Sequence, residues 1–265
     1  MAESLRLLAV TAHPDDESLG MGGTLAKSAA EGVEVSILAA TRGERGRYRD
    51  GKDHPGQVAL GRIREQELRK AAQELGAREV AFLDYLDAEL DRAEPRQAID
   101  RIAAHLRRLR PHVVITFGPE GAYGHPDHIA ISQFTTAALV RAAHPAGAAD
   151  GHLVSKLYYI AWPAGIWAAY QAAFKRMVSR VDGVERQATP WPDWAVTTRI
   201  DTAEHWPRVW RAVQCHESQI AQYGPLGALP PELHRELWGA QSFYRALSLV
   251  NGGRETESDL FAGLR

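Results

Sequence analysis

The sequence is almost free of cysteine: among its 265 residues there is one, Cys215. A disulfide framework and a cysteine-ligated zinc site are therefore excluded within a single chain. The scarcity fits a reducing compartment. It leaves histidine, aspartate and glutamate as the side chains that could bind a metal ion.

Long apolar runs and an excess of positive charge are also missing. No segment approaches the roughly 18 uninterrupted apolar residues of a membrane helix, and residues 1–4 lack the basic start of a signal peptide. We therefore expect a cytoplasmic protein with no membrane partner. The formal net charge of −2 argues against a nucleic-acid partner, because generic binding to phosphates needs a positive surface. The hydrophobic content of 45% is typical of a soluble globular protein.

Apolar and amphipathic segments alternate along the first half of the chain. They predict strands at residues 5–12, 33–40, 80–83 and 113–117, and helices at 19–30, 60–75, 95–109 and 129–143. Such alternation predicts an α/β fold with a mostly parallel sheet flanked by helices.

The second half is less regular. It predicts strands at residues 156–162 and 195–200, helices at 165–180, 202–222 and 233–249, and a turn-rich excursion at 182–194. The helix at 165–180 carries the aromatic anchors Trp167, Tyr170 and Phe174. No stretch has the composition of a linker, so we expect one domain spanning residues 1–265.

Two similar motifs follow two of the predicted strands. His13-Pro14-Asp15-Asp16-Glu17 comes directly after the first strand, and His125-Pro126-Asp127-His128 comes shortly after the fourth. Crowded carboxylates repel each other, and a cation would neutralise them. Ligand sites in open parallel sheets lie beyond the carboxyl ends of the strands, so both motifs should lie on the same rim. The pattern predicts a metal site there.

The spacing leaves the ligand set open. A catalytic zinc usually has three protein ligands and one position open to water. Adjacent residues such as Asp15 and Asp16 point in different directions, so one can bind the metal while the other faces the substrate. The same holds for Asp127 and His128. His125 and Asp127 are close enough to pair, and the carboxylate would raise the pKa of the histidine.

The paired motifs resemble those of the LmbE-like (PIG-L) zinc-dependent N-deacetylases. The resemblance extends to a helix with Arg64 and Glu67-Leu68, to Tyr123, and to a C-terminal segment with Arg211-Ala212, His216 and Ser218-Gln219. The family often has lysine where Arg211 stands. Residues 5–143 match the family well, whereas residues 150–195 match nothing we can identify.

The resemblance implies a Rossmann-like fold and a role for each residue. His13, Asp16 and His128 would bind one Zn²⁺ per chain, with Fe²⁺ as an alternative metal. Asp15 would be the general base for a water activated by the metal. His125, paired with Asp127, would stabilise the oxyanion and protonate the leaving amine. Arg64 and Tyr123 would contact the substrate.

The resemblance also implies a substrate class. The family removes acetyl groups from N-acetylglucosamine-type conjugates and releases acetate and a free amine, so the partner would be a small-molecule amino-sugar conjugate. We expect residues 1–145 to form the metal-site core and residues 146–265 a more variable, substrate-side portion. The sequence does not identify the group attached to N-acetylglucosamine in the substrate. Inositol or malate glycosides, chitin fragments and glycopeptide antibiotics are the alternatives. The sequence does not identify the oligomeric state either, and a homo-oligomer is one alternative. The roles of His216 and of residues 42–49 are also open.

Other interpretations of the motifs are weaker. An aspartate of the first motif could simply cap the following helix, but a second His-Pro-Asp at the same rim favours a metal. Two histidines and a carboxylate also occur in non-haem Fe(II) oxygenases, which are mostly all-β barrels. A nucleotide-binding domain would carry Gly-x-Gly-x-x-Gly after the first strand, and Gly20, Gly22 and Gly23 come too late. A non-catalytic metal-binding protein would not need Asp15 or His125 beside a complete ligand set.

Overall fold

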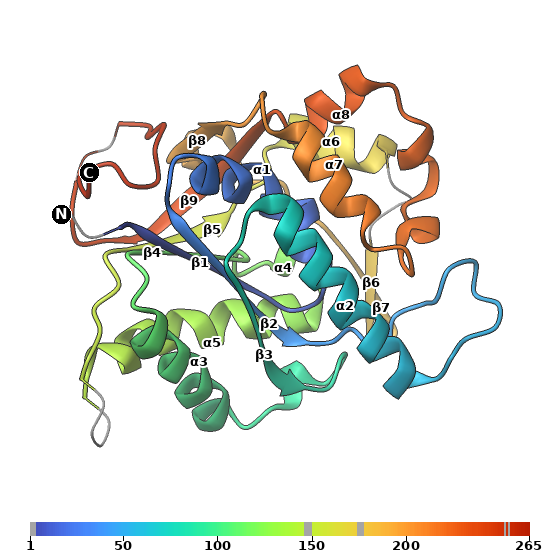
Figure 1. The fold of residues 1–265 in the computed structure, drawn as a ribbon, viewed down its shortest axis with the longest axis horizontal. Helices are drawn as coiled ribbons and strands as arrows, with labels where there is room; N and C mark the ends of the chain where they lie inside the picture. The colour runs from blue at the N-terminus through green and yellow to red at the C-terminus, as the bar shows by residue number, and fades with distance from the viewer. Residues whose placement is uncertain (1–3, 146–149, 174–177, 252, 254) are drawn as a thin grey trace.

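A seven-stranded sheet forms the centre of the protein, with strand order β3-β2-β1-β4-β5-β9-β8 (Figure 1). The computed structural model describes residues 4–145, 150–173, 178–251, 253 and 255–265. The strands are β1 (Arg6–Thr11), β2 (Glu34–Thr41), β3 (Glu79–Tyr85), β4 (Val113–Thr116), β5 (Lys156–Ile160), β8 (Thr198–Asp201) and β9 (Ala240–Ser248). Strands β1 to β5 are parallel, and β9 runs antiparallel to both β5 and β8.

Helices cover both faces of the sheet (Figure 1). On one face α1 (Asp16–Ala30), α2 (Gln57–Leu75) and α7 (Trp206–Gln214) contact one another, and on the other α3 (Pro95–Leu109) packs against α5 (Pro126–Ala143). Strands β1 and β4 are buried because both faces are covered, which explains their continuous apolar sequences. The predicted α/β fold with a mostly parallel, helix-flanked sheet is confirmed.

Shorter elements complete the chain. They are α4 (Gly121–Gly124), α6 (Ala164–Ala173), α8 (Pro231–Trp238), the strands β6 (Val178–Val181) and β7 (Val184–Gln187), and the 3₁₀ segments Leu90–Arg92, Asp193–Ala195 and Ile220–Ala228. Among the described residues, no helix is long and apolar enough to cross a membrane.

Strands β1 and β4 lie side by side where the strand order changes direction. From β1 the chain proceeds outward to β2 and β3, and it then returns to place β4 on the other side of β1. The carboxyl ends of two such strands leave a crevice in which α/β proteins bind ligands. Both His-Pro-Asp motifs follow these two strands, so the fold brings them together as expected.

Three predicted helices in the second half were partly wrong. The segment predicted as a helix at residues 233–249 contains α8, which ends before Gly239, and then strand β9. The predicted helix at 202–222 ends with α7 at Gln214. The predicted helix at 165–180 is α6, and residues 178–180 belong to β6; Phe174 lies outside the described residues.

A β-hairpin occupies part of the region predicted as a turn-rich excursion. Strands β6 and β7 pair antiparallel through Asp182 and Gly183, which have φ of 50° and 78°. Two central residues with positive φ are what a tight hairpin turn requires. The turn-rich prediction, which rested on Pro190 and Pro192, did not include these two short strands.

Candidate active site

Three buried side chains from the two motifs converge at the crevice between β1 and β4. The Nε2 atom of His128 lies 3.3 Å from Nδ1 of His13. An Asp16 oxygen lies 3.7 Å from Nδ1 of His13, and the other lies 3.5 Å from Nε2 of His128. The structure therefore brings together all three residues proposed as metal ligands.

This arrangement fits a zinc ion. Ligand atoms placed about 2.0–2.1 Å from a tetrahedral zinc are roughly 3.3 Å apart. The two histidine nitrogens have this separation, and one ligand atom from each of the three residues lies within 4.8 Å of the other two. Burial raises the pKa of Asp16 to about 7, so a cation is needed for this carboxylate to be fully ionised at neutral pH. The geometry and the chemistry of the donors both suit a divalent metal.

Two carboxylates hold the ring of His13 from behind. Its Nε2 atom lies 3.1 Å from Asp87 Oδ1 and 3.2 Å from Asp127 Oδ2. Burial lowers the pKa of His13, but the hydrogen bonds with Asp127 and Asp87 outweigh burial and raise it well above its ordinary value. A proton on Nε2 leaves Nδ1 free to bind a metal, as in the carboxylate–histidine pairs of zinc sites.

The expected pairing of Asp127 with His125 is wrong in its geometry. The carboxylate of Asp127 contacts His13 instead. Asp127 is hydrogen-bonded to His125 only through its backbone, whose N–H donates to Nδ1 of His125 at 3.2 Å. His125 is the N-cap of α5, which explains this bond. Burial and the neighbouring His13 lower the pKa of His125 to about 4, against the smaller opposing effect of Asp127.

Asp15 occupies the turn between β1 and α1. Its φ of 110° and ψ of −26° are rare for a residue with a side chain. Its backbone N–H donates to Glu17 Oε2 at 3.0 Å. Its Oδ2 atom accepts from Arg64 Nη2 at 3.0 Å and from the hydroxyl of Tyr223 at 2.8 Å. Among the described residues, no hydrogen bond reaches the other oxygen, Oδ1.

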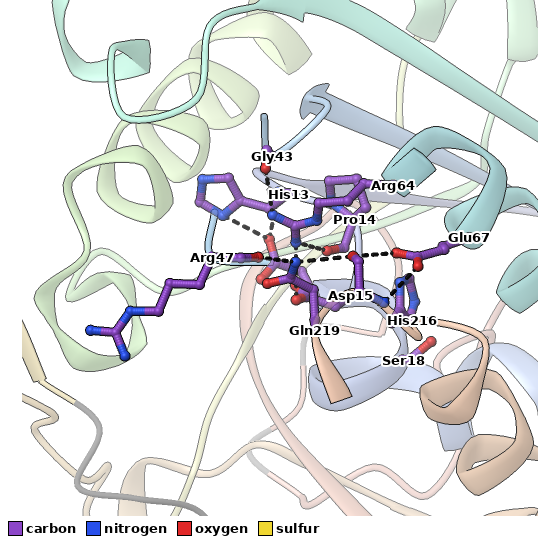
Figure 2. A network of polar contacts seen from close by, with 12 residues as sticks. His13, Pro14, Asp15, Ser18, Gly43, Arg47, Arg64, Glu67, His216 and Gln219 are labelled. Carbon is purple, nitrogen blue, oxygen red and sulfur yellow. Dashed lines mark hydrogen bonds and ion pairs between the residues drawn. The ribbon is translucent and has the colours of Figure 1, made fainter. Parts of the chain in front are cut away.

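Arg64 is buried and directed at Asp15 (Figure 2). Its Nη1 donates to the carbonyl of Gly43 at 2.8 Å, and its Nη2 donates to the carbonyl of Pro14 as well as to Asp15. A substrate contact stays a prediction for Arg64. The contacts in the structure hold the turn that carries Asp15.

Tyr123 lies beside the metal ligands. Its ring centroid is 5.8 Å from that of His125 and 5.5 Å from that of His128. Burial raises the pKa of its hydroxyl, so this group is a neutral hydrogen-bonding group at physiological pH. Its substrate contact stays a prediction, which its place in the lining of the adjacent pocket supports.

A pocket of about 440 Å³ opens next to His125. One wall is formed by motif residues and by the segment after β3, and the other by the β6–β7 hairpin. The lining residues are Ala88, Asp91, Arg92, Tyr123, His125, Pro126, Asp127, Val178, Ser179, Arg180, Val181 and Asp182. The pocket is large enough for a small organic molecule.

Sequence reasoning missed Asp87 and Tyr223, and it left His216 open. Nε2 of His216 donates to Glu17 Oε1 at 2.9 Å, and both side chains are fully buried. It therefore supports the residue that accepts the Asp15 N–H. The resemblance of residues 216–219 to a recurring family segment was the only signal for this part of the site. In the sequence, nothing distinguished Asp87 from the other carboxylates of the acidic stretch after the third strand.

Residues 8–139 match the family described as PIG-L, GlcNAc-PI de-N-acetylase. The chain is 36% identical to the 1D-myo-inositol 2-acetamido-2-deoxy-alpha-D-glucopyranoside deacetylase of Streptomyces griseus, with 98% of this chain and 89% of that protein covered. The fold is similar to that of N,N'-diacetylchitobiose deacetylase from Pyrococcus horikoshii, with a TM-score of 0.69, 19% identity, and coverage of 92% of this chain and 84% of that one.

The same fold also occurs in an enzyme of a different kind. GalB from Pseudomonas putida, a 4-carboxy-2-hydroxymuconate hydratase, has a TM-score of 0.69 and 20% identity, with 94% and 99% of the two chains covered. The fold alone therefore does not decide between reactions. The reaction therefore has to be inferred from the family match, from the similar deacetylase of Streptomyces griseus and from the site residues.

Proposed function

The chain belongs to the PIG-L family of de-N-acetylases, and we propose that it uses zinc to remove the acetyl group from an N-acetylglucosamine conjugate. The products are acetate and a free amine. One observation carries the proposal: His13, Asp16 and His128 form a buried group whose ligand atoms lie within 4.8 Å of one another, directly beside Asp15.

The protein's own residues can perform the proton transfers of this reaction. When bound, the metal supplies a Lewis acid that polarises the acetyl carbonyl and makes water more acidic. Oδ1 of Asp15 accepts the proton of the attacking water, because Oδ2 is already bonded by Arg64 and Tyr223. Nδ1 of His125 accepts the Asp127 N–H, so in the neutral ring Nε2 carries the proton and donates a hydrogen bond to the developing oxyanion. The proton that Asp15 takes from the water is the one that passes to the leaving amine.

The pocket beside His125 supports a hydroxyl-rich conjugate. Its lining combines two carboxylates, Asp91 and Asp182, with two guanidinium groups, Arg92 and Arg180. A hydroxyl group of the substrate can donate a hydrogen bond to a carboxylate and accept one from a guanidinium group. The relative from Streptomyces griseus is named for an inositol glycoside. We therefore propose a polyol glycoside of N-acetylglucosamine as the substrate, with the polyol in this pocket.

We also retain the proposed division of the chain, with residues 1–145 as the metal-site core and residues 146–265 as a substrate-side portion. The hairpin wall of the pocket supports it. Tyr223 bonds to Asp15 and His216 bonds to Glu17, so the second portion also reaches the first motif.

A metal and activity assay tests the proposal. We expect purified protein to contain about one zinc per chain. It should release a free amine from N-acetylglucosaminyl-inositol, measured with an amine-reactive fluorophore, and lose this activity on chelation and regain it with zinc. Full activity in metal-free protein would refute the metal-dependent mechanism. Iron-dependent oxygen consumption without deacetylation would favour an oxygenase instead.

Two variants separate the roles of the adjacent aspartates. Asp15→Asn should keep the zinc and lose about 10²–10⁴-fold in kcat, the usual contribution of a general base. Asp16→Asn should lose the zinc. If instead zinc content falls with Asp15→Asn and survives Asp16→Asn, the two assignments are exchanged.

A further inference from the structure

Tyr223 belongs to neither motif, yet its hydroxyl lies 2.8 Å from Asp15 Oδ2. The tyrosine comes from the 3₁₀ segment Ile220–Ala228, far along the chain from Asp15, and its side chain is buried. We propose that Tyr223 is a positioning residue that fixes the rotation of the Asp15 carboxylate. This inference rests on the proposed role of Asp15 as general base.

The backbone leaves the direction of the Asp15 carboxylate to its contacts. Asp15 precedes the first residue of α1 and has a φ of 110°, so the helix does not restrict its side chain. The last torsion of an aspartate side chain is broad and close to two-fold, which makes its two oxygens interchangeable unless a contact distinguishes them. Turnover needs one oxygen to face the reacting water.

Two donors on one oxygen remove this ambiguity. Arg64 and Tyr223 approach the same atom, Oδ2, from α2 and from the C-terminal 3₁₀ segment. One donor alone would still let the carboxylate swing about that contact. Two donors from different directions define the plane of the carboxylate and leave Oδ1 for the water.

A second positively charged donor would be less suitable than a phenol. Arg64 already places one cation on Asp15. A hydrogen bond from a neutral hydroxyl fixes the geometry of the carboxylate without placing a second cation beside it. Burial and the nearby Asp15 raise the pKa of Tyr223 well above its ordinary value, so the hydroxyl keeps its proton.

The position of Tyr223 is set by the segment just before it. Ser218 bonds through its N–H and hydroxyl to Glu67 on α2, each at 2.7 Å. Gln219 donates to the carbonyl of Arg47 at 2.7 Å, and His216 bonds to Glu17. Figure 2 shows His216 and Gln219 on either side of Asp15, with the Arg47 side chain pointing away from the network. The segment before the 3₁₀ segment is thus attached to α2, to the loop after β2 and to the first turn of α1.

The test is Tyr223→Phe in the zinc-loaded enzyme. We expect kcat to fall about ten- to hundredfold, the size expected for losing a hydrogen bond to a charged group. KM and zinc content should stay within twofold of the wild type, because the hydroxyl bonds to Asp15, which is not one of the proposed metal ligands. Tyr170→Phe is the matched control: it removes another buried hydroxyl, which donates to the carbonyl of Leu19, and should leave kcat unchanged.

A double-mutant cycle with Asp15→Asn completes the test. If Tyr223 acts through Asp15, Tyr223→Phe should cause no further loss in the Asp15→Asn enzyme. The same fold loss in both backgrounds, or a kcat within twofold of the wild type for Tyr223→Phe alone, would overturn the proposal. Should Tyr223→Phe not fold, Tyr223→Leu serves as the second variant without a donor.

A crystal structure of the Tyr223→Phe variant gives a measurement independent of activity. It should show the Asp15 carboxylate rotated or in two orientations, while an unchanged carboxylate would overturn the proposal. Absence of deacetylation by the wild-type enzyme would instead contradict the proposed function. The two failures are therefore distinguishable.

Discussion

Asp127 connects the metal ligands to the rest of the fold through a single carboxylate. Its two oxygens accept the backbone N–H groups of Ala88 at 2.8 Å and Leu90 at 3.2 Å, in the segment after β3. One of the same oxygens contacts the ring of His13. A carboxylate in this position fixes the orientation of the ring and the nitrogen that faces the metal. We therefore infer that Asp127 would act on metal binding through His13.

We predict that Asp127→Asn weakens zinc binding about 10–100-fold, the usual cost of losing such a partner of a metal-binding histidine. The affinity is measured by competition with a coloured chelator of known zinc affinity. Asp91→Asn is the control, because Asp91 lines the same pocket but is exposed and contacts no metal ligand among the described hydrogen bonds. An unchanged affinity in Asp127→Asn would contradict this role.

The clustering of the proposed ligand residues was predictable from sequence because each His-Pro-Asp motif is local and follows an apolar strand. Their partners were not predictable in the same way. Tyr223 reaches Asp15 across 208 positions, and the family-like segment at residues 216–219 does not indicate that a tyrosine four positions later contacts Asp15. Asp87 is one carboxylate among several in its segment, and only the packing of that segment against α5 selects it. Long-range contacts of this kind come from the fold.

The loop after β2 shows how an element is shaped around one side chain. A Cβ at Gly43 would lie 2.1 Å from Nη1 of Arg64, and one at Gly46 would lie 2.6 Å from the same atom. The glycines therefore leave the space that the guanidinium needs to reach Asp15. Glu44 accepts the Asp87 N–H, and the Arg45 N–H donates to Asp87, so the loop also holds that carboxylate. Residues 42–49 thus hold Arg64 and Asp87, the side chains that contact Asp15 and His13.

We predict that Gly43→Ala lowers kcat at least about tenfold, because it displaces Arg64 and with it a charged hydrogen bond to Asp15. Gly51→Ala is a matched control: Gly51 also has positive φ, at 86°, but a Cβ there meets nothing within 4 Å. Both changes carry a similar backbone strain of about 1–2 kcal/mol. Steady-state kinetics and thermal unfolding of the two variants separate strain from displacement. Equal kcat values would show that Arg64 tolerates the change.

The first half of the fold was predictable because its strands and helices have clean and different periods, and α3 begins and ends where the sequence predicts. The second half was harder. Gly239 was an available helix stop before β9, but β9 is an antiparallel strand between β5 and β8, and both partners lie far away in the sequence. The Asp182-Gly183 pair was a usable hairpin signal, although its strands are short and mostly polar.

At the scale of the whole molecule, a buried charge cluster attaches the C-terminal segment to the sheet. Glu257 accepts from Lys156 at 2.8 Å, Tyr158 at 2.7 Å and Thr198 at 3.0 Å, and it pairs with Arg245 at 2.7 Å. These partners lie on β5, β8 and β9, at the end of the sheet away from β3. Lys156 is fully buried, so its charge depends on Glu257 for compensation.

We predict that Glu257→Gln lowers the free energy of unfolding at pH 7 by about 3 kcal/mol, because it leaves the buried Lys156 ammonium poorly compensated. Burial alone would raise the pKa of Glu257, but its bonds to Lys156 and Tyr158 hold it below the ordinary value of 4.5. Its charge therefore stabilises the fold fully above that value, and this stabilisation is lost as the pH falls from there through the lower, folded-state pKa.

The difference between wild type and Glu257→Gln should accordingly shrink as the pH drops below the ordinary glutamate value. Urea unfolding of both proteins in metal-free form, followed over this pH range, measures the difference without a contribution from zinc. Glu255→Gln, at an exposed position two residues earlier, should match the wild type at every pH. A Glu257→Gln difference that stays constant with pH would mean that the side chain contributes through its shape, because a charge contribution has to disappear once the carboxylate is protonated.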